Sequence, residues 1–186
     1  MAPLALRGVS TVFLDRDGTI NVKAPEGEYI RSPEEMVLLP GAAGAVAALN
    51  AAGLRTILIT NQRWLSQPSA DPARYAATHD RLAELLATEG ARLDAAYHCP
   101  HAADSCDCRK PLAGMLLRAA AEHGVDLGRS VMIGDSPADV AAGRAAGAAT
   151  ILLGPAGTPT DGADFVVPDL AAAARLILSA REAGHA

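Results

Sequence analysis

Short apolar runs rich in β-branched residues alternate along the chain with alanine-rich stretches. The apolar runs have the length and composition of buried strands, which we predict at Thr11–Asp15, Arg55–Thr60, Leu93–Cys99, Ser130–Asp135, Ala149–Leu153 and Asp164–Val167. The alanine-rich stretches predict helices at Gly41–Ala52, Pro72–Thr88, Leu112–His123, Pro137–Ala146 and Leu170–Glu182. This alternation predicts an α/β fold, a three-layer α/β/α sandwich around a mainly parallel sheet, in a single domain over residues 1–186.

Polar residues stand where the predicted strands end. Asp15, Thr60, Cys99 and Asp135 each close a strand. In an open parallel sheet, ligands bind beyond the carboxyl ends of the strands. The sequence therefore predicts one functional site at that edge.

The string "FLDRDGTIN" places Asp15 and Asp17 two residues apart as a strand runs into a glycine turn. In extended backbone such side chains point the same way, so both can face one pocket. Asp15 can attack phosphorus to form an aspartyl-phosphate, and Asp17 can protonate the leaving alkoxide and later deprotonate water. Gly18 permits a tight turn that brings backbone N–H groups toward phosphate oxygens. The alternative is a solvated turn or a calcium-binding loop, where D-x-D-G also occurs.

Further candidates lie at the other strand ends. Asp135 can join Asp15 in holding Mg2+, because carboxylates and a phosphate dianion repel one another without a cation. Lys110 can offset the remaining negative charge. Ser136 to Asp139 match a helix capping box, so Asp139 is either a cap or a functional residue.

Charge and hydropathy narrow the class of protein. The chain has 186 residues, with 16 basic against 21 acidic side chains, for a net charge of −5. This balance argues against a nucleic-acid partner, although a local pocket can still be positive. No apolar run approaches the roughly 20 residues of a membrane helix, and the opening residues lack a signal peptide. We expect a cytoplasmic monomer with no membrane partner, and therefore reduced thiols.

All three cysteines lie in "CPHAADSCDCRKP". Cys99, Cys106 and Cys108, with a nitrogen of His101, would complete a tetrahedral Cys3His zinc site. Because protein fills all four positions, such a zinc would be structural and would order loop 99–108, an insertion that leads into Lys110. Incidental thiols and a nucleic-acid-binding zinc module are the alternatives, and the acidic charge disfavours the second.

The motifs together resemble the haloacid dehalogenase superfamily of phosphohydrolases. They are Asp15-x-Asp17-Gly-Thr, Thr60-Asn61, Lys110 and Gly134-Asp135. The longer strings "LDRDGTIN", "TNQ", "CPH…CDCRKP" and "GDS" are similar to the branch that holds the heptose bisphosphate 7-phosphatases and the histidinol-phosphate phosphatases. The intact motif set disfavours a non-catalytic scaffold.

This resemblance implies a role for each matched residue. It implies Asp15 as nucleophile, Asp17 as acid and base, and Mg2+ bound by Asp15, the Asp17 carbonyl and Asp135. It implies that Thr60 and Lys110 stabilise the phosphoryl group and that Arg109 helps to recognise the substrate. Independently of the resemblance, the amides of Asn61 and Gln62 can bind the substrate through its phosphate oxygens, although Thr-Asn after a strand is also common in ordinary turns. A minimal cap and a zinc-stabilised loop are implied as well.

Two features bear on the substrate. The branch commonly has a glycine-rich segment after "TNQ", whereas this chain reads "RWLSQPSAD", and Trp64 could either stack on a substrate or cover the core. The short zinc loop is nearer the histidinol-phosphate type, but the longer opening string favours the heptose type. We expect removal of the 7-phosphate of D-glycero-D-manno-heptose 1,7-bisphosphate. The alternative substrates are histidinol phosphate and another small phosphorylated metabolite.

Overall fold

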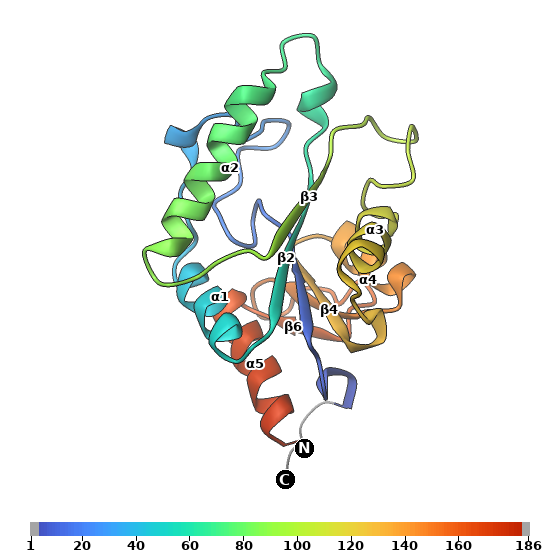
Figure 1. The fold of residues 1–186 in the computed structure, drawn as a ribbon. Coiled ribbons are helices and arrows are strands. Elements are labelled where there is room, and N and C mark those ends of the chain that lie inside the picture. Colours follow the sequence, from blue (N-terminus) through green and yellow to red (C-terminus); the bar gives the residue numbers. More distant parts are fainter. Residues whose placement is uncertain (1–3, 184–186) are drawn as a thin grey trace.

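A parallel sheet forms the centre of the computed structural model, which describes residues 4–183 (Figure 1). Its strands are β1 (Thr11–Leu14), β2 (Arg55–Asn61), β3 (Ala95–Cys99), β4 (Ser130–Gly134), β5 (Ala149–Leu153) and β6 (Phe165–Val167). The strands lie in the order β3-β2-β1-β4-β5-β6, and each neighbouring pair is parallel. The predicted sheet is confirmed.

Helices cover both faces of this sheet. They are α1 (Ala42–Ala51), α2 (Pro72–Ala87), α3 (Gly114–His123), α4 (Pro137–Ala146) and α5 (Leu170–Glu182). Helices α1, α2 and α5 lie on one face, and α3 and α4 lie on the other (Figure 1). The three-layer α/β/α sandwich is therefore confirmed, while the assignment of residues 1–186 to a single domain stays a prediction.

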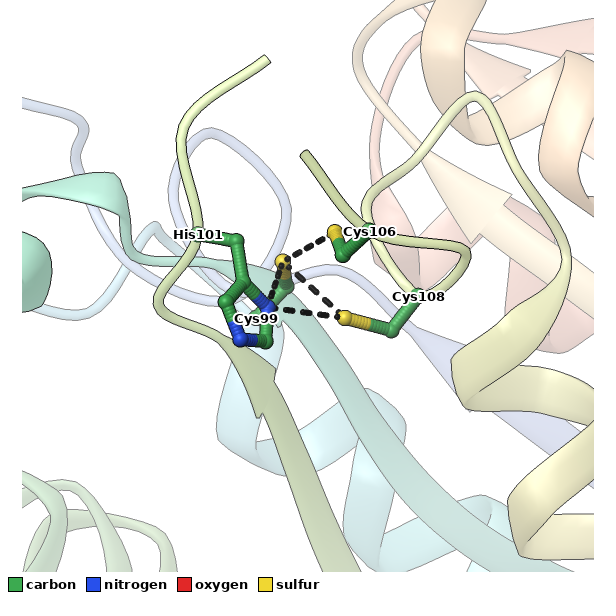
Figure 2. Close-up of side chains that lie close together, drawn as sticks. All are labelled: Cys99, His101, Cys106 and Cys108. Atoms are coloured by element: carbon green, nitrogen blue, oxygen red, sulfur yellow. Dashed lines mark hydrogen bonds between the residues drawn. The ribbon is translucent and has the colours of Figure 1, made fainter. Parts of the chain in front are cut away.

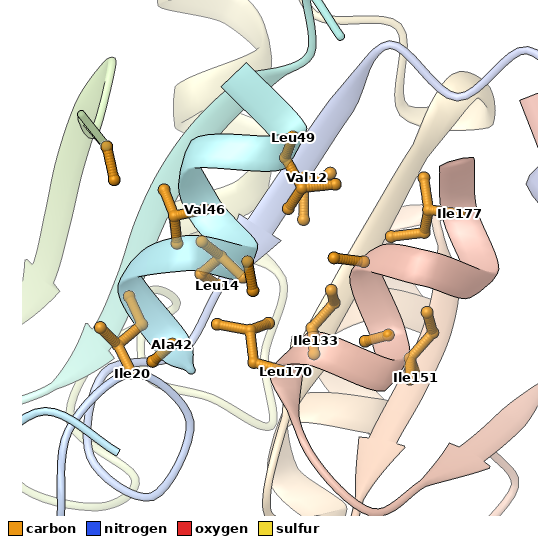
Figure 3. Packing of buried hydrophobic residues seen from close by; sticks show 14 of the residues in the cluster. Val12, Leu14, Ile20, Ala42, Val46, Leu49, Ile133, Ile151, Leu170 and Ile177 are labelled. Carbon is orange, nitrogen blue, oxygen red and sulfur yellow. The ribbon is translucent and has the colours of Figure 1, made fainter. Parts of the chain in front are cut away.

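The middle of each central strand is apolar because both faces of these strands are buried. Val12 and Leu14 of β1 pack toward α1 and α5, as Figure 3 shows, whereas Phe13 belongs to the cluster under α3 and α4. All three side chains are fully buried. A strand with one solvated face would instead alternate apolar and polar residues.

Two predicted elements begin two residues later than expected, and residues at both starts contact other parts of the chain. Strand β3 starts at Ala95, and the preceding Asp94 carboxylate accepts a hydrogen bond from the backbone N–H of Thr56 at 2.8 Å. Helix α3 starts at Gly114, whose N–H donates to the Asp107 carbonyl. A Cβ at position 114 would clash with that backbone, so this close approach requires glycine.

The strand order determines where the polar residues at the strand ends come together. The chain leaves β1 toward β2 and β3 and then crosses back to β4 on the other side of β1, which creates a topological switch point between β1 and β4. Asp15 follows β1 there and donates its backbone N–H to the carbonyl of Ile133 at 2.9 Å. Asp135 follows β4 at the same level. No helix in residues 4–183 is long and apolar enough to cross a membrane.

Candidate active site

Three carboxylates meet at the switch point. Asp15 and Asp135 follow β1 and β4, and Asp139 lies in the first turn of α4; each offers an oxygen within 4.8 Å of the others. Gly18 makes this possible, because its φ is +91° and a Cβ there would clash with the Asp135 carboxylate. Clustered carboxylate oxygens are the donors that hard cations such as Mg2+ prefer. The donor set therefore fits the expected metal.

Lys110 lies among these carboxylates and is only 4% exposed. Its Nζ lies 2.6 Å from Asp15 Oδ1 and 2.6 Å from Asp139 Oδ1, and it donates to the Ile59 carbonyl at 2.9 Å. Burial alone would lower the pKa of Lys110, but the two carboxylates outweigh it and raise the pKa. Burial raises the pKa of Asp15 to about 7, although Lys110 opposes this rise.

Asp17 lines the same cavity as Asp15, as the spacing predicts. Three side chains hold its carboxylate. Arg16, which is fully buried, donates from Nη2 at 2.9 Å and from Nε at 3.2 Å, Asn21 donates at 2.9 Å, and Gln62 donates at 3.0 Å. Asp17 is therefore fixed in place on one side while its side chain remains 24% exposed.

The end of β2 supplies three polar residues with three different placements. Thr60 and Asn61 line the cavity, and the Asn61 amide also makes two hydrogen bonds, at 3.0 and 3.1 Å, with the backbone of Lys110. Gln62 is fully buried and is not among the residues that line the cavity. The Asn61 and Gln62 side chains are thus engaged with protein groups, and their contact with substrate stays a prediction.

The cavity has a volume of about 540 Å3, and loop 23–30 forms much of its wall. Within it, Lys23 is a residue that the sequence did not single out. Its Nζ lies 2.6 Å from Asp135 Oδ2, while its side chain is 64% exposed. A lysine in an irregular loop carries no periodicity or motif that could have indicated this contact.

Asp139 makes the predicted capping contacts and also a contact within the acidic cluster. Its Oδ2 accepts hydrogen bonds from the Ser136 N–H at 3.1 Å and the Ser136 hydroxyl at 2.6 Å, which is the capping box. Its Oδ1 pairs with Lys110. One carboxylate therefore caps the start of helix α4 and adds charge to the acidic cluster.

The cysteine cluster lies beyond the end of β3 (Figure 2). Cys99 Sγ lies 3.6 Å from Cys106 Sγ and 3.3 Å from Cys108 Sγ, and His101 Nδ1 lies 3.6 Å from Cys99 Sγ and 3.2 Å from Cys108 Sγ. Zinc–sulfur bonds of about 2.3 Å in a tetrahedron require sulfurs about 3.8 Å apart. The four donors therefore fit a zinc ion after small shifts.

The cysteine loop is attached to the acidic cluster through the backbone. The N–H of Gln62 donates to the Cys99 carbonyl at 2.7 Å, and Asn61 holds Lys110 at the other end of the loop. Arg109 places Nη1 3.5 Å from the His101 carbonyl and is not among the residues that line the cavity. Arg109 thus contacts the loop, and its contact with substrate stays a prediction.

The model of the haloacid dehalogenase-like hydrolases matches residues 6–147. The chain belongs to this family. A D-glycero-beta-D-manno-heptose-1,7-bisphosphate 7-phosphatase of Pseudomonas aeruginosa is 36% identical over 91% of this chain and 98% of its own length. The D-glycero-D-manno-heptose-1,7-bisphosphate 7-phosphatase of Thermosynechococcus vestitus is 40% identical over 89% of this chain and 94% of its own.

A solved structure gives the same assignment. The D,D-heptose 1,7-bisphosphate phosphatase of B. bronchiseptica, crystallised with magnesium and phosphate, superposes with a TM-score of 0.82 at 36% identity and covers 92% of this chain and 99% of its own. These relatives place the chain among the phosphatases of the family. The resemblance predicted from the motifs is confirmed.

Proposed function

We propose that this protein is a Mg2+-dependent phosphomonoester hydrolase that removes the 7-phosphate of D-glycero-D-manno-heptose 1,7-bisphosphate. The observation that carries the proposal is the buried pair of Asp15 and Lys110 at the base of a polar cavity, 2.6 Å apart. The names of the relatives support the substrate. We expect the enzyme to act as a cytoplasmic monomer on this sugar bisphosphate.

In this proposal Asp15 attacks phosphorus through a carboxylate oxygen, and the bond to the sugar oxygen breaks. Asp17 gives its proton to that departing oxygen, and then takes a proton from the water that hydrolyses the aspartyl-phosphate. The ammonium of Lys110 offsets the charge that accumulates on the phosphoryl oxygens, and the Thr60 hydroxyl donates to one of them. Each of these groups lines the cavity.

The carboxylates of Asp15, Asp135 and Asp139 would hold Mg2+, with the Asp17 carbonyl as a further donor. When bound, Mg2+ supplies positive charge between the nucleophile and the phosphate dianion. Asp139 is an addition to the expected ligand set, because its oxygen lies within the same 4.8 Å cluster. We also assign a structural Zn2+ to Cys99, His101, Cys106 and Cys108.

The test measures phosphate release with and without Mg2+ from heptose 1,7-bisphosphate, histidinol phosphate and several other sugar phosphates. We expect Mg2+-dependent release that is fastest from the heptose bisphosphate and absent in Asp15→Asn. Asp80→Asn, which changes an exposed carboxylate on α2, is the matched control and should remain active. Release that persists in Asp15→Asn would contradict the nucleophile, and faster release from histidinol phosphate would contradict the substrate.

A further inference from the structure

Trp64 is the only tryptophan of the chain and lies in the 3-10 helix Arg63–Ser66, directly after β2. Its side chain is 3% exposed and is not among those that line the cavity. Of the two roles that the sequence left open, stacking on substrate is therefore disfavoured. The indole has a different polar partner, because its Nε1–H donates to Oε1 of Gln62 at 2.9 Å.

Gln62 connects this indole to two residues of the cavity. Its Nε2 donates to Asp17 Oδ2 at 3.0 Å and to Thr60 Oγ1 at 2.9 Å. An amide nitrogen has two N–H donors, so this fully buried group uses both of them. With Oε1 occupied by the indole, the Gln62 amide is satisfied at each end.

The orientation of the amide determines what Thr60 and Asp17 can do. Because Thr60 Oγ1 accepts from Gln62, its own hydroxyl proton stays available for a phosphoryl oxygen. In the reversed orientation, Oε1 would face the Asp17 carboxylate and would take the Thr60 proton. The indole N–H opposes that reversal, since it would then face the amide NH2 group with no acceptor.

We propose that Trp64 is a positioning residue for the phosphatase reaction: through the Gln62 amide, its indole N–H fixes the Asp17 carboxylate and frees the Thr60 hydroxyl. The inference rests on the proposed function, which gives Asp17 and Thr60 their roles. It makes Gln62 the residue that transmits the effect. The substrate does not touch Trp64.

The ring of Trp64 has a second contact, which the experiment must separate from the first. The guanidinium of Arg31 lies 5.6 Å from the centre of this ring and 5.6 Å from the ring of Tyr29, which lines the cavity. A cation between two aromatic faces holds the cavity loop against the 3-10 helix. Replacing Trp64 with a small residue would remove both contacts together.

Trp64→Phe keeps an aromatic ring and removes the N–H. We expect kcat to fall about three- to tenfold, the effect of one lost hydrogen bond that acts in the transition state, with little change in KM. Asp80→Asn, which changes the exposed carboxylate on α2, again serves as the control, and its kcat should not change.

A double-mutant cycle tests whether the effect passes through Gln62. Gln62→Met keeps the length of the side chain and removes the amide, and we expect its kcat to fall about ten- to a hundredfold. In that background Trp64→Phe should cause no further loss. Thermal melting of each variant checks that the protein is folded.

The indole N–H also gives a signal that is independent of activity. As the protein has one tryptophan, its indole proton is a single NMR resonance, which should exchange slowly with solvent in the wild type and faster in Gln62→Met. Unchanged kcat in a folded Trp64→Phe variant, or equal losses in the two backgrounds, would overturn the role of Trp64. A wild type that releases no phosphate from any of the phosphomonoesters would instead overturn the proposed function.

Discussion

Two polar clusters lie at the same edge of the sheet, and they are assembled in opposite ways. The acidic cluster draws Asp15, Lys110, Asp135 and Asp139 from segments far apart in the chain, and Lys110 neutralises part of its charge. The cysteine cluster comes from the single loop 99–108, and His101 in it is exposed. Burial, followed by hydrogen bonds with Cys99 and Cys106, raises the pKa of Cys108 to about 12.

The difference suggests two separate roles: the acidic cluster serves the reaction, and the cysteine cluster orders a loop. In the acidic cluster, Asp15 and Asp135 follow buried strands and Asp139 lies in helix α4, so we expect its geometry not to depend on a bound cation. The cysteine loop has few apolar residues to pack, and thiolates need a cation beside them, so we expect its order to depend on the proposed zinc ion. Loss of charge in the first cluster should therefore affect the reaction directly, whereas loss of zinc should act through the position of Lys110.

The largest effect is expected from Lys110→Met. It removes the cation beside the nucleophile, and phosphate release should fall about a thousandfold. It also leaves the Asp15 carboxyl buried without its partner, so its folded pKa rises further above the unfolded value of about 4. A raised carboxyl pKa gives stability that is lost as pH increases, so the melting temperature should fall between about pH 5 and about pH 8 more steeply than in the wild type.

Lys23→Met is the matched control, because Lys23 is a lysine of the same cavity that is mostly exposed. It should not change the pH dependence of melting. Equal activity losses in the two lysine variants would contradict the distinction between the buried and the exposed ion pair.

Removal of zinc is expected to have the next largest effect. With Cys106→Ser, or after a zinc-selective chelator with Mg2+ kept in excess, activity should fall about ten- to a hundredfold and melting should begin at a lower temperature. Omission of Mg2+ should abolish activity with little change in melting. Elemental analysis of reduced protein should give one zinc per chain, and its absence would contradict the site.

Asn61→Leu tests the link between the two clusters. The substitution removes both hydrogen bonds from the Asn61 amide to the Lys110 backbone. We expect kcat to fall about tenfold, while the zinc content stays at one per chain. If the variant kept full activity, the cysteine loop would position Lys110 without this contact.

The smallest expected effect is the change in Mg2+ affinity caused by Lys23→Met. The ammonium of Lys23 pairs with Asp135, a proposed metal ligand, so its removal should lower the Mg2+ concentration for half-maximal activity. Because exposed ion pairs are weak, the change should be about twofold. Titration of Mg2+ by calorimetry measures the same shift in affinity. Weaker Mg2+ binding in the variant would contradict the idea that Lys23 and Mg2+ compete for the Asp135 carboxylate.

The elements could be predicted from the sequence because their signals are local. The apolar run of β5 and the punctuated helices α4 and α5 have the predicted bounds, and the motif aspartates lie together because parallel strands end at one edge. Side-chain direction could not be predicted this way. Gln62 faces the protein because Asp17 and Trp64 satisfy its amide, and such contacts depend on tertiary packing.

The central claim is that Asp15 carries the phosphoryl group. The direct test is mass spectrometry of the Asp17→Asn variant incubated with an aryl phosphate, whose leaving group needs no proton. Attack by Asp15 should proceed, while hydrolysis should stall without the base, so the peptide that contains Asp15 should gain the mass of one phosphoryl group. Turnover with no adduct on that peptide, or an adduct on another residue, would contradict the account.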